Sequence, residues 1–345
     1  MKITERENLL RVINEQEPAW VPRKGHVTYL EDDPEQHKPC CVTVVAEVFP
    51  LRRGSKGGRI DIFGVEYEPT DSTDGAELPI PNRFILGDIK KWRDIIKAPI
   101  LDGTDWRAIA EKSLRNIDRN ESCVQFSGSA GFFQMLTNFM GFTEGLIALQ
   151  EEPEECMELI DYLCTFYETI AKNLIGYIKP DFFGVADDNA TARSPFISKE
   201  MYQRIFVPFL ARITKIGSDL GLPIDMHDCG RCEAFIDDWV KLGVKMWNPA
   251  QLSNDLAGIK KQYGNSFILN GCWDSQGPPG WPNADEDTVR QAVRDCIDAY
   301  APGGGFCFRA SFYGSKDNAA QARRQALWIT DEYNKYGRTF YKRLG

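Results

Sequence analysis

The chain has 345 residues, a net charge of −9 at neutral pH and 43% hydrophobic residues. Acidic and basic side chains are interleaved, which disfavours nucleic acid as a partner, and no apolar run approaches the roughly 20 residues that span a bilayer. Residues 3–14 have the pattern of a charged amphipathic helix rather than of a signal peptide. We therefore expect a soluble, cytoplasmic protein without a membrane partner, in which most of the ten cysteines are reduced core residues.

The first part of the chain predicts strands separated by polar loops. After the helix at 3–14, strands are expected at 19–24 and 41–48, and residues 60–67 alternate like one arm of a hairpin. The glycine-rich basic stretch 52–59 favours a solvated turn, and the functional alternative is an anion-binding lid.

From residue 88 onward, helical segments alternate with short apolar strands. Helices are predicted at 88–97, 105–118, 131–149, 153–178, 198–220, 231–242, 252–263, 285–300 and 316–342, and strands at 123–126, 182–186, 223–227, 244–247, 267–270 and 306–308. Alternation of this kind is typical of a parallel sheet, and the two earlier strands bring the count to eight. The sequence therefore predicts an α/β fold, a (β/α)8 TIM barrel with an N-terminal extension, in a single domain spanning residues 1–345.

Polar residues follow most of the late strands, at the barrel end where active sites form. Asp187 and Asp188 follow the strand at 182–186; they are either a helix-capping pair or catalytic carboxylates near a substrate or metal. Candidate substrate-binding residues follow the next strands, namely Asn248, Gln251, Trp273 and Asp274.

The stretch from Ile224 to Gly230 carries the most specific signal, a strand that ends in His227 and Cys229. Residues two apart on a strand point the same way, so an imidazole and a thiolate can reach one cation. Cys307, at the end of the last strand, is the expected third ligand, with Cys232 and Cys272 as rivals. Three protein ligands with one open position are typical of catalytic zinc.

Several segments together resemble the uroporphyrinogen decarboxylase superfamily and, within it, the corrinoid-linked methyltransferase branch. They are 224–230, 236–239, 244–251, 260–271, Phe63 to Glu66 and the Asp187-Asp188 pair. The resemblance implies that His227, Cys229 and Cys307 bind zinc. It also implies a corrinoid partner protein whose cobalamin gives a methyl group to a thiol or takes one from a methoxylated compound.

The decarboxylase branch fits the sequence less well. Arg23 and Lys24 only partly match its arginine-rich N-terminal segment, and Arg309-Ala310-Ser311 stands where that branch has a histidine. Two alternatives remain at this point: a metal-independent decarboxylase or lyase using Asp187 or Asp188, and a non-catalytic zinc scaffold closed by Cys232. The methyl donor and acceptor, the direction of transfer and the oligomeric state, including a homodimer, stay open.

Overall fold

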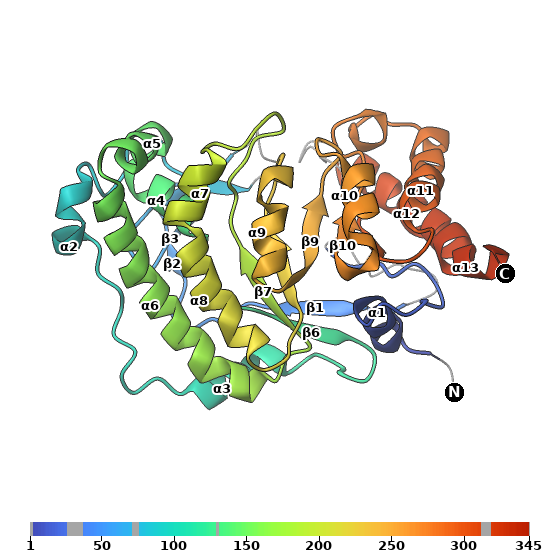
Figure 1. The fold of residues 1–345 in the computed structure, drawn as a ribbon, viewed down its shortest axis with the longest axis horizontal. Coiled ribbons are helices and arrows are strands. Elements are labelled where there is room, and N and C mark those ends of the chain that lie inside the picture. Colours follow the sequence, from blue (N-terminus) through green and yellow to red (C-terminus); the bar gives the residue numbers. More distant parts are fainter. Residues whose placement is uncertain (1–2, 26–36, 71–75, 129–130, 312–318, 345) are drawn as a thin grey trace.

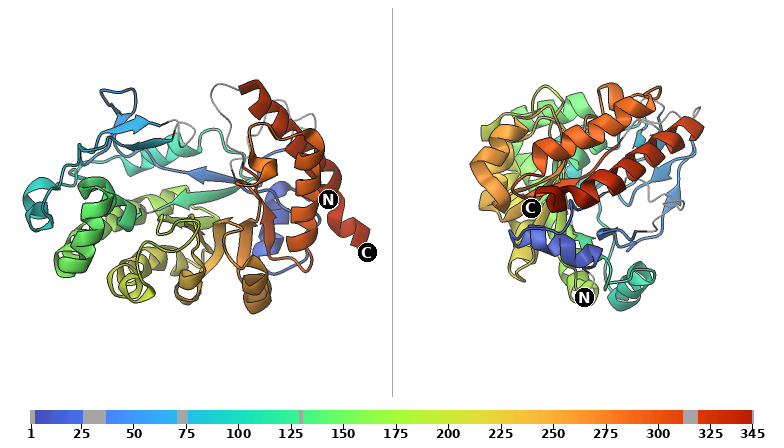
Figure 2. Two further views of the ribbon diagram at one scale, coloured as in Figure 1. Left: turned by 90° about the horizontal axis from the view of Figure 1, so that it is seen from above. Right: turned by 90° about the vertical axis from the view of Figure 1, so that its right-hand side faces the viewer.

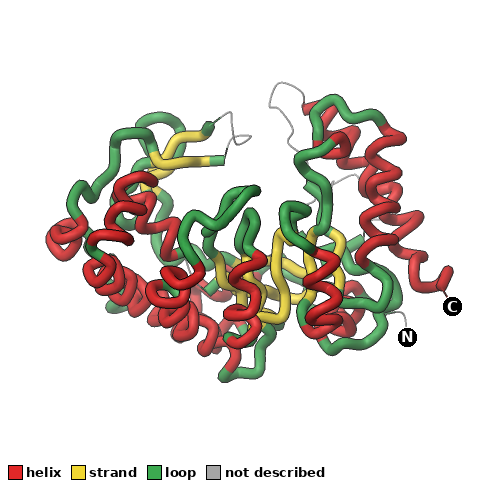
Figure 3. The backbone as a smooth tube through the Cα atoms, turned by 45° about the horizontal axis from the view of Figure 1, so that its top comes forward, coloured by secondary structure: helices red, strands yellow, loops and turns green. Residues whose placement is uncertain are grey.

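The computed structural model describes residues 3–25, 37–70, 76–128, 131–311 and 319–344. Its centre is a seven-stranded parallel sheet in the order β1-β6-β7-β8-β9-β10-β11, curved into part of a barrel (Figures 1 and 3). The strands are β1 (Cys41–Val44), β6 (Cys123–Ser127), β7 (Phe182–Ala186), β8 (Ile224–His227), β9 (Val244–Ala250), β10 (Ile268–Gly271) and β11 (Phe306–Phe308).

An eighth position is filled by the chain around Arg23, which forms an isolated parallel bridge with Phe308 of β11. The amide of Lys24 donates to the carbonyl of Phe308, and the amide of Phe308 donates to the carbonyl of Pro22. On the other side, the thiol of Cys40, just before β1, lies 3.0 Å from the carbonyl oxygen of Arg23. Eight chain segments thus surround one interior, as the strand count predicted.

Helices cover the outside of the sheet, as Figure 2 shows from two directions. They are α1 (Glu5–Ile13), α2 (Trp92–Ile95), α3 (Trp106–Leu114), α4 (Phe132–Met140), α5 (Phe142–Glu151), α6 (Pro153–Ile178), α7 (Lys199–Ile205), α8 (Val207–Ser218), α9 (Ile236–Lys241), α10 (Leu256–Tyr263), α11 (Glu286–Tyr300), α12 (Ala319–Tyr336) and α13 (Phe340–Leu344). The helix predicted at 131–149 is divided at Gly141, which has a φ of 88°, and the one at 198–220 is divided at Phe206. Residues 316–318 of the last predicted helix lie outside the described residues.

Helix α1 closes the amino-terminal end of the barrel. Thr4 and Glu7 form a capping box that fixes its start. Its apolar face packs on a layer of inward-pointing strand residues, and together they form one buried cluster of Leu9, Val12, Ile13, Cys40, Cys123, Phe182, Met246, Ile268 and Cys307. Because this end is filled with apolar side chains, polar groups of the interior can gather only above this layer.

Two short hairpins lie between β1 and β6, one of β2 (Arg52–Arg53) with β3 (Arg59–Ile60) and one of β4 (Tyr67–Pro69) with β5 (Glu77–Pro79). The glycine-rich segment 52–59 is thus a hairpin turn. At the other end of the chain, the Tyr333 ring of α12 stacks on Phe308 and its hydroxyl donates to the carbonyl of Val21. Helix α12 therefore supports the junction between β11 and the segment around Arg23.

The predicted fold class is confirmed. That residues 1–345 form a single domain stays a prediction. Among the described residues, none of the helices combines the length and apolar character needed to cross a bilayer.

Candidate functional site

The inward-pointing residues of the strands alternate with outward-pointing ones and form two layers. The lower layer consists of the strand residues of the apolar cluster, and α1 packs against it from below. Two residues further along each strand, the next inward positions carry mostly polar groups: Gln125, Asp225, Asn248, Asn270 and Arg309. Period-two alternation in a strand thus builds a polar floor directly above an apolar one.

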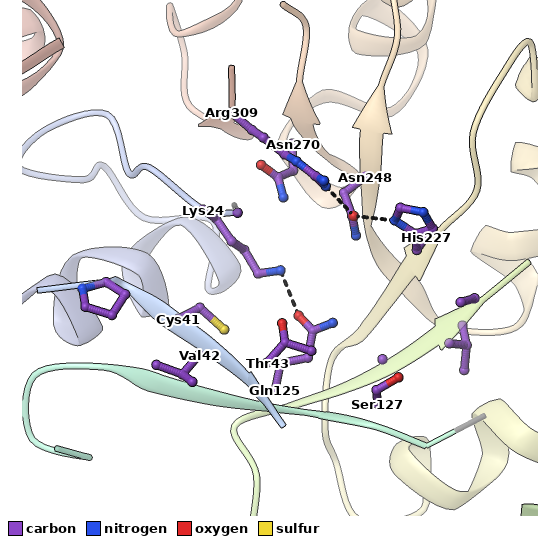
Figure 4. A pocket seen from close by; sticks show the side chains of 15 residues that line it. Lys24, Cys41, Val42, Thr43, Gln125, Ser127, His227, Asn248, Asn270 and Arg309 are labelled. Atoms are coloured by element: carbon purple, nitrogen blue, oxygen red, sulfur yellow. Dashed lines mark hydrogen bonds between the residues drawn. The ribbon is translucent and has the colours of Figure 1, made fainter. Parts of the chain in front are cut away.

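A cavity of about 590 Å³ opens above this floor. Its walls combine the polar layer with Lys24, Thr43, Ser127 and His227 and with less polar residues, namely Pro39, Cys41 and Ala186. Figure 4 shows the polar residues around the cavity. This volume lies in the range typical of small-molecule sites.

Lys24 and Asp225 form a buried ion pair at the base of the cavity, with 2.5 Å between Nζ and Oδ2. Lys24 is 5% and Asp225 0% exposed, and Nζ also donates to Gln125 at 2.7 Å. Burial lowers the pKa of Lys24, but the carboxylate of Asp225 more than offsets this effect and the pKa lies above its usual value. The ammonium group is therefore charged and already neutralised by a protein partner.

His227 is held by Asn248, its register partner on β9. The oxygen Oδ1 of Asn248 lies 2.9 Å from Nδ1 of His227 and 2.7 Å from Nη1 of Arg309. The amide nitrogen Nδ2 faces Asp225 Oδ1 and the carbonyl of Met226. Since Arg309 only donates and these two groups only accept, the orientation of the Asn248 amide is fixed, and His227 must donate through Nδ1.

The lone pair on Nε2 of His227 is consequently free, and it points toward Cys229. Sγ of Cys229 lies 3.8 Å from this nitrogen, and a carboxylate oxygen of Asp188 lies within 4.8 Å of both ligand atoms. Tetrahedral zinc, with bonds of about 2.0 Å to nitrogen and 2.3 Å to sulfur, holds such ligands about 3.5 Å apart. The three groups could therefore converge on one zinc ion if their side chains moved closer together. A metal-binding histidine usually donates its other ring N–H to an oxygen, as Nδ1 of His227 does to Asn248.

Asp188 and Cys229 also contact each other through the backbone. Oδ1 of Asp188 accepts a hydrogen bond from the amide of Cys229 at 3.1 Å, and Oδ2 accepts from the side chain of Gln134 at 3.2 Å. Burial, together with the nearby carboxylate of Asp188, raises the pKa of Cys229. A metal that binds here must displace the thiol proton.

The structure does not bring Cys307 to this group, which corrects the expected ligand set. Cys307 is 0% exposed and belongs to the apolar lower layer, while the inward residue of the same strand at cavity level is Arg309. Among the described residues, the third group that could reach one ion together with His227 and Cys229 is Asp188. The rivals lie elsewhere as well: Cys232 Sγ donates to Asp228 Oδ1, and Cys272 is buried beside Cys296 near a separate cavity.

The other candidate residues have varied positions. The carboxylate of Asp187 accepts hydrogen bonds from the amides of Phe133 and Gln134, so it caps α4, and burial raises its pKa to about 6. Gln251 accepts from the amide of Gly230 and lies outside the cavity wall.

Trp273 and Asp274 also lie away from the cavity. Trp273 is 5% exposed and packs edge-on against Phe308. Asp274 closes a turn by accepting from the amide of Gly277 at 2.7 Å and lines the separate cavity near α11. Of the four expected substrate-binding residues, only Asn248 lines the central cavity.

Comparison of the sequence with known protein families places the chain in one of them. The family model described as uroporphyrinogen decarboxylase (URO-D) matches residues 110–312, and the chain belongs to this family. A search of curated proteins gave no significant match.

One solved structure shows the same fold over nearly the whole chain. A methyltransferase from Methanosarcina mazei aligns with a TM-score of 0.60 at 12% identity, covering 96% of this chain and 100% of that one. A 3-keto-D-glucoside 4-epimerase from E. coli aligns over 73% of this chain and 97% of that one, with 13% identity and a TM-score of only 0.37.

Proposed function

We propose that this protein is a zinc-dependent methyltransferase. It moves a methyl group between a small substrate, a thiol or a methoxylated compound, and the cobalamin of a separate corrinoid protein. The observation that carries the proposal is that a ring nitrogen of His227, Cys229 Sγ and an Asp188 oxygen lie within 4.8 Å of one another. Membership in the uroporphyrinogen decarboxylase family and the shared fold with a solved methyltransferase support it.

Three protein ligands leave one position of a tetrahedral ion for a substrate, as in catalytic zinc sites. Asp188, His227 and Cys229 would hold the ion, which would supply a Lewis acid able to lower the pKa of a thiol or to polarise an ether oxygen. Asn248 keeps His227 in the tautomer that offers Nε2, and Asp188 fixes the backbone of Cys229 by accepting its amide hydrogen. The cavity beside His227 would hold the substrate, and the corrinoid partner would dock at its opening.

A lyase that uses Asp187 as acid or base has less support. The pKa of about 6 is suitable for proton transfer. However, the carboxylate is occupied by the amino terminus of α4 and does not line the central cavity.

The first test is the zinc content of untagged protein, purified with added zinc and measured by elemental analysis. We expect about one zinc per chain by the stoichiometry of a single site, and a strong loss in Cys229→Ser and Asp188→Asn. Cys156→Ala is the matched control, because this buried cysteine lies in α6. Absence of zinc from the wild type would refute the proposal.

The second test is methyl transfer, followed by the change in cobalamin absorbance. Wild-type protein with methylcobalamin and a panel of thiols, or with reduced cobalamin and methoxylated compounds, should convert one cobalamin form into the other. Cys229→Ser should not. Zinc binding without transfer in either direction would instead favour a non-catalytic zinc scaffold.

A further inference from the structure

Arg309 is a cation without a counter-ion inside the central cavity. Within the described residues, its guanidinium makes one hydrogen bond, from Nη1 to Asn248, and no ion pair. Lys24, the other cation of the cavity, is by contrast neutralised by Asp225. A guanidinium has five N–H donors, so most of those of Arg309 remain available.

Arg309 is nevertheless largely withdrawn from water. Burial lowers its pKa, which indicates that the charge is desolvated without full compensation. The chain makes room for it with Gly25, which has a φ of 128° and where an added Cβ would lie 2.7 Å from Cδ of Arg309. The side chain is therefore held over the cavity by local geometry and by Asn248, rather than by a carboxylate.

Asn270 lies beside Arg309 in the cavity wall, as Figure 4 shows. It is 1% exposed, and neither its side-chain nitrogen nor its oxygen has a hydrogen-bond partner among the described residues. Buried polar groups in folded proteins are nearly always paired, because an unpaired one costs about 1–3 kcal/mol. Among the described residues, the Asn270 amide has no hydrogen-bond partner and the neighbouring Arg309 guanidinium has no ion-pair partner. This arrangement indicates that one ligand group binds to both side chains.

We propose that Arg309 and Asn270 bind a carboxylate of the substrate, an inference that rests on the proposed function for the identity of the reacting group. A carboxylate matches the planar donor fork of arginine and accepts a further hydrogen bond from the amide of Asn270. One uncompensated cation balances the single charge of a carboxylate, whereas a phosphate dianion would leave excess charge in a desolvated site.

The position of this subsite defines the substrate class. Arg309 and His227 contact the same oxygen of Asn248, so the anion subsite and the metal group lie within the length of a small molecule. Pro39 and Ala186 provide apolar surface in the same cavity. The substrate is thus a small carboxylic acid with an apolar body that carries a thiol or a methoxy group at the end facing His227.

The test compares two probes of the same shape on metal-free protein by titration calorimetry: 4-methoxybenzoate and 4-methoxybenzamide. We expect the acid to bind at least ten times more tightly than the amide. Arg309→Met should remove this preference. Asn270→Asp, which leaves Asn248 and Arg309 in place, should also abolish binding of the acid by repulsion. Arg107→Met, on the exposed face of α3, is the matched control.

Equal affinity for acid and amide, or a preference for the acid that survives both substitutions, overturns the subsite. So does the lack of measurable binding across an acid series from propionate to 4-methoxybenzoate. Because the titration needs neither zinc nor cobalamin, its outcome is independent of the proposed function. Acid binding without zinc uptake refutes the methyltransferase, and methyl transfer without acid preference refutes only the subsite.

Discussion

Oδ1 of Asn248 lies 2.9 Å from Nδ1 of His227, and this contact determines which ring nitrogen faces Cys229. The same oxygen accepts a hydrogen bond from Arg309, and the side-chain amide nitrogen of Asn248 donates to Asp225 and to the carbonyl of Met226. Asn248 was expected to bind substrate, but its hydrogen-bonding groups are already used within the protein. Its position indicates a residue that orients the His227 ring, the proposed metal ligand.

Replacing Asn248 should therefore weaken zinc binding without removing a ligand. In Asn248→Leu, neither tautomer of His227 is favoured and the ring is free to rotate, so we expect zinc affinity to fall 10- to 100-fold, the usual effect of losing such a support. Competition with a chromophoric chelator measures this affinity. Asn173→Leu, on the solvent-facing side of α6, is the control. An unchanged affinity in Asn248→Leu would mean that this contact does not orient the ligand.

Cys307 provides a test of the ligand set. Because it packs in the apolar layer above α1, Cys307→Ala should keep its zinc and lose about 1 kcal/mol of unfolding free energy, as expected for a small cavity. Cys229→Ala should show the opposite pattern, with zinc lost and little change in the stability of the metal-free protein. Elemental analysis and urea denaturation distinguish the two. Zinc loss in a well-folded Cys307→Ala variant would restore Cys307 as a ligand and displace Asp188.

The sequence predicted the alternating strands and helices, the barrel and the meeting of strand ends, because the strands and helices follow from local periodicity and their alternation is typical of a barrel. It did not predict that Cys307 lies below the cavity, since a residue's depth within a barrel depends on register with neighbouring strands. Asn270 is the register partner of Cys307, and the next inward residue after Cys307 is Arg309. Only the register shows which of these side chains reaches the cavity.

One signal for the missed residues was present in the sequence. Gln125, Asp225 and Asn270 are polar residues within otherwise apolar strands, at inward positions. A polar side chain in such a place must be paired or serve a ligand. Only the three-dimensional structure shows that Asp225 pairs with Lys24, some 200 positions earlier in the chain. It also shows that Asn270 has no hydrogen-bond partner among the described residues.

The ion pair between Lys24 and Asp225 should be costly to break from one side. Lys24→Met leaves a carboxylate at 0% exposure without its cation, and we expect a loss of about 3–5 kcal/mol of unfolding free energy. Adding Asp225→Asn to this variant should restore more than half of the loss, since no buried charge then remains. Lys172→Met, which breaks the exposed pair with Glu168, should cost less than about 1 kcal/mol. Similar losses for both lysine variants in urea denaturation would contradict the buried pair.

The capping role of Asp187 leads to a separate expectation. Its carboxylate accepts from the amides of Phe133 and Gln134, so Asp187→Ala should lower the unfolding free energy by about 0.5–2 kcal/mol, the usual cost of losing a helix cap. Zinc content should stay near one per chain by the single-site stoichiometry. The matched control is Asp285→Ala, which removes the cap of α11 far from the cavity and should cost a similar amount. If Asp187→Ala keeps full stability but loses methyl transfer, Asp187 acts on the substrate, as the sequence first indicated.

Asp228 gives the metal-free protein a pH-dependent stability. Burial raises its pKa to about 8, although Asn189 donates two hydrogen bonds to it, and the facing carboxylates of Asp187 and Asp188 add to the shift. The folded state thus holds this proton more tightly than the unfolded state, whose carboxyl has a pKa of about 3.9. The contribution is fully present below that value and is lost as the pH rises to about 8.

The unfolding free energy of wild-type protein in chelator should therefore fall between about pH 5 and pH 8, by at most about 1.4 kcal/mol per pH unit from this group. In Asp228→Asn the titrating group is gone, and rotation of the Asn189 amide lets its unpaired oxygen accept from the new amide. The dependence on pH should then be shallower, with the remaining slope due to Asp187, whose pKa is raised in the same direction. Parallel pH profiles for wild type and Asp228→Asn would show that Asp228 ionises in the folded protein as it does in water.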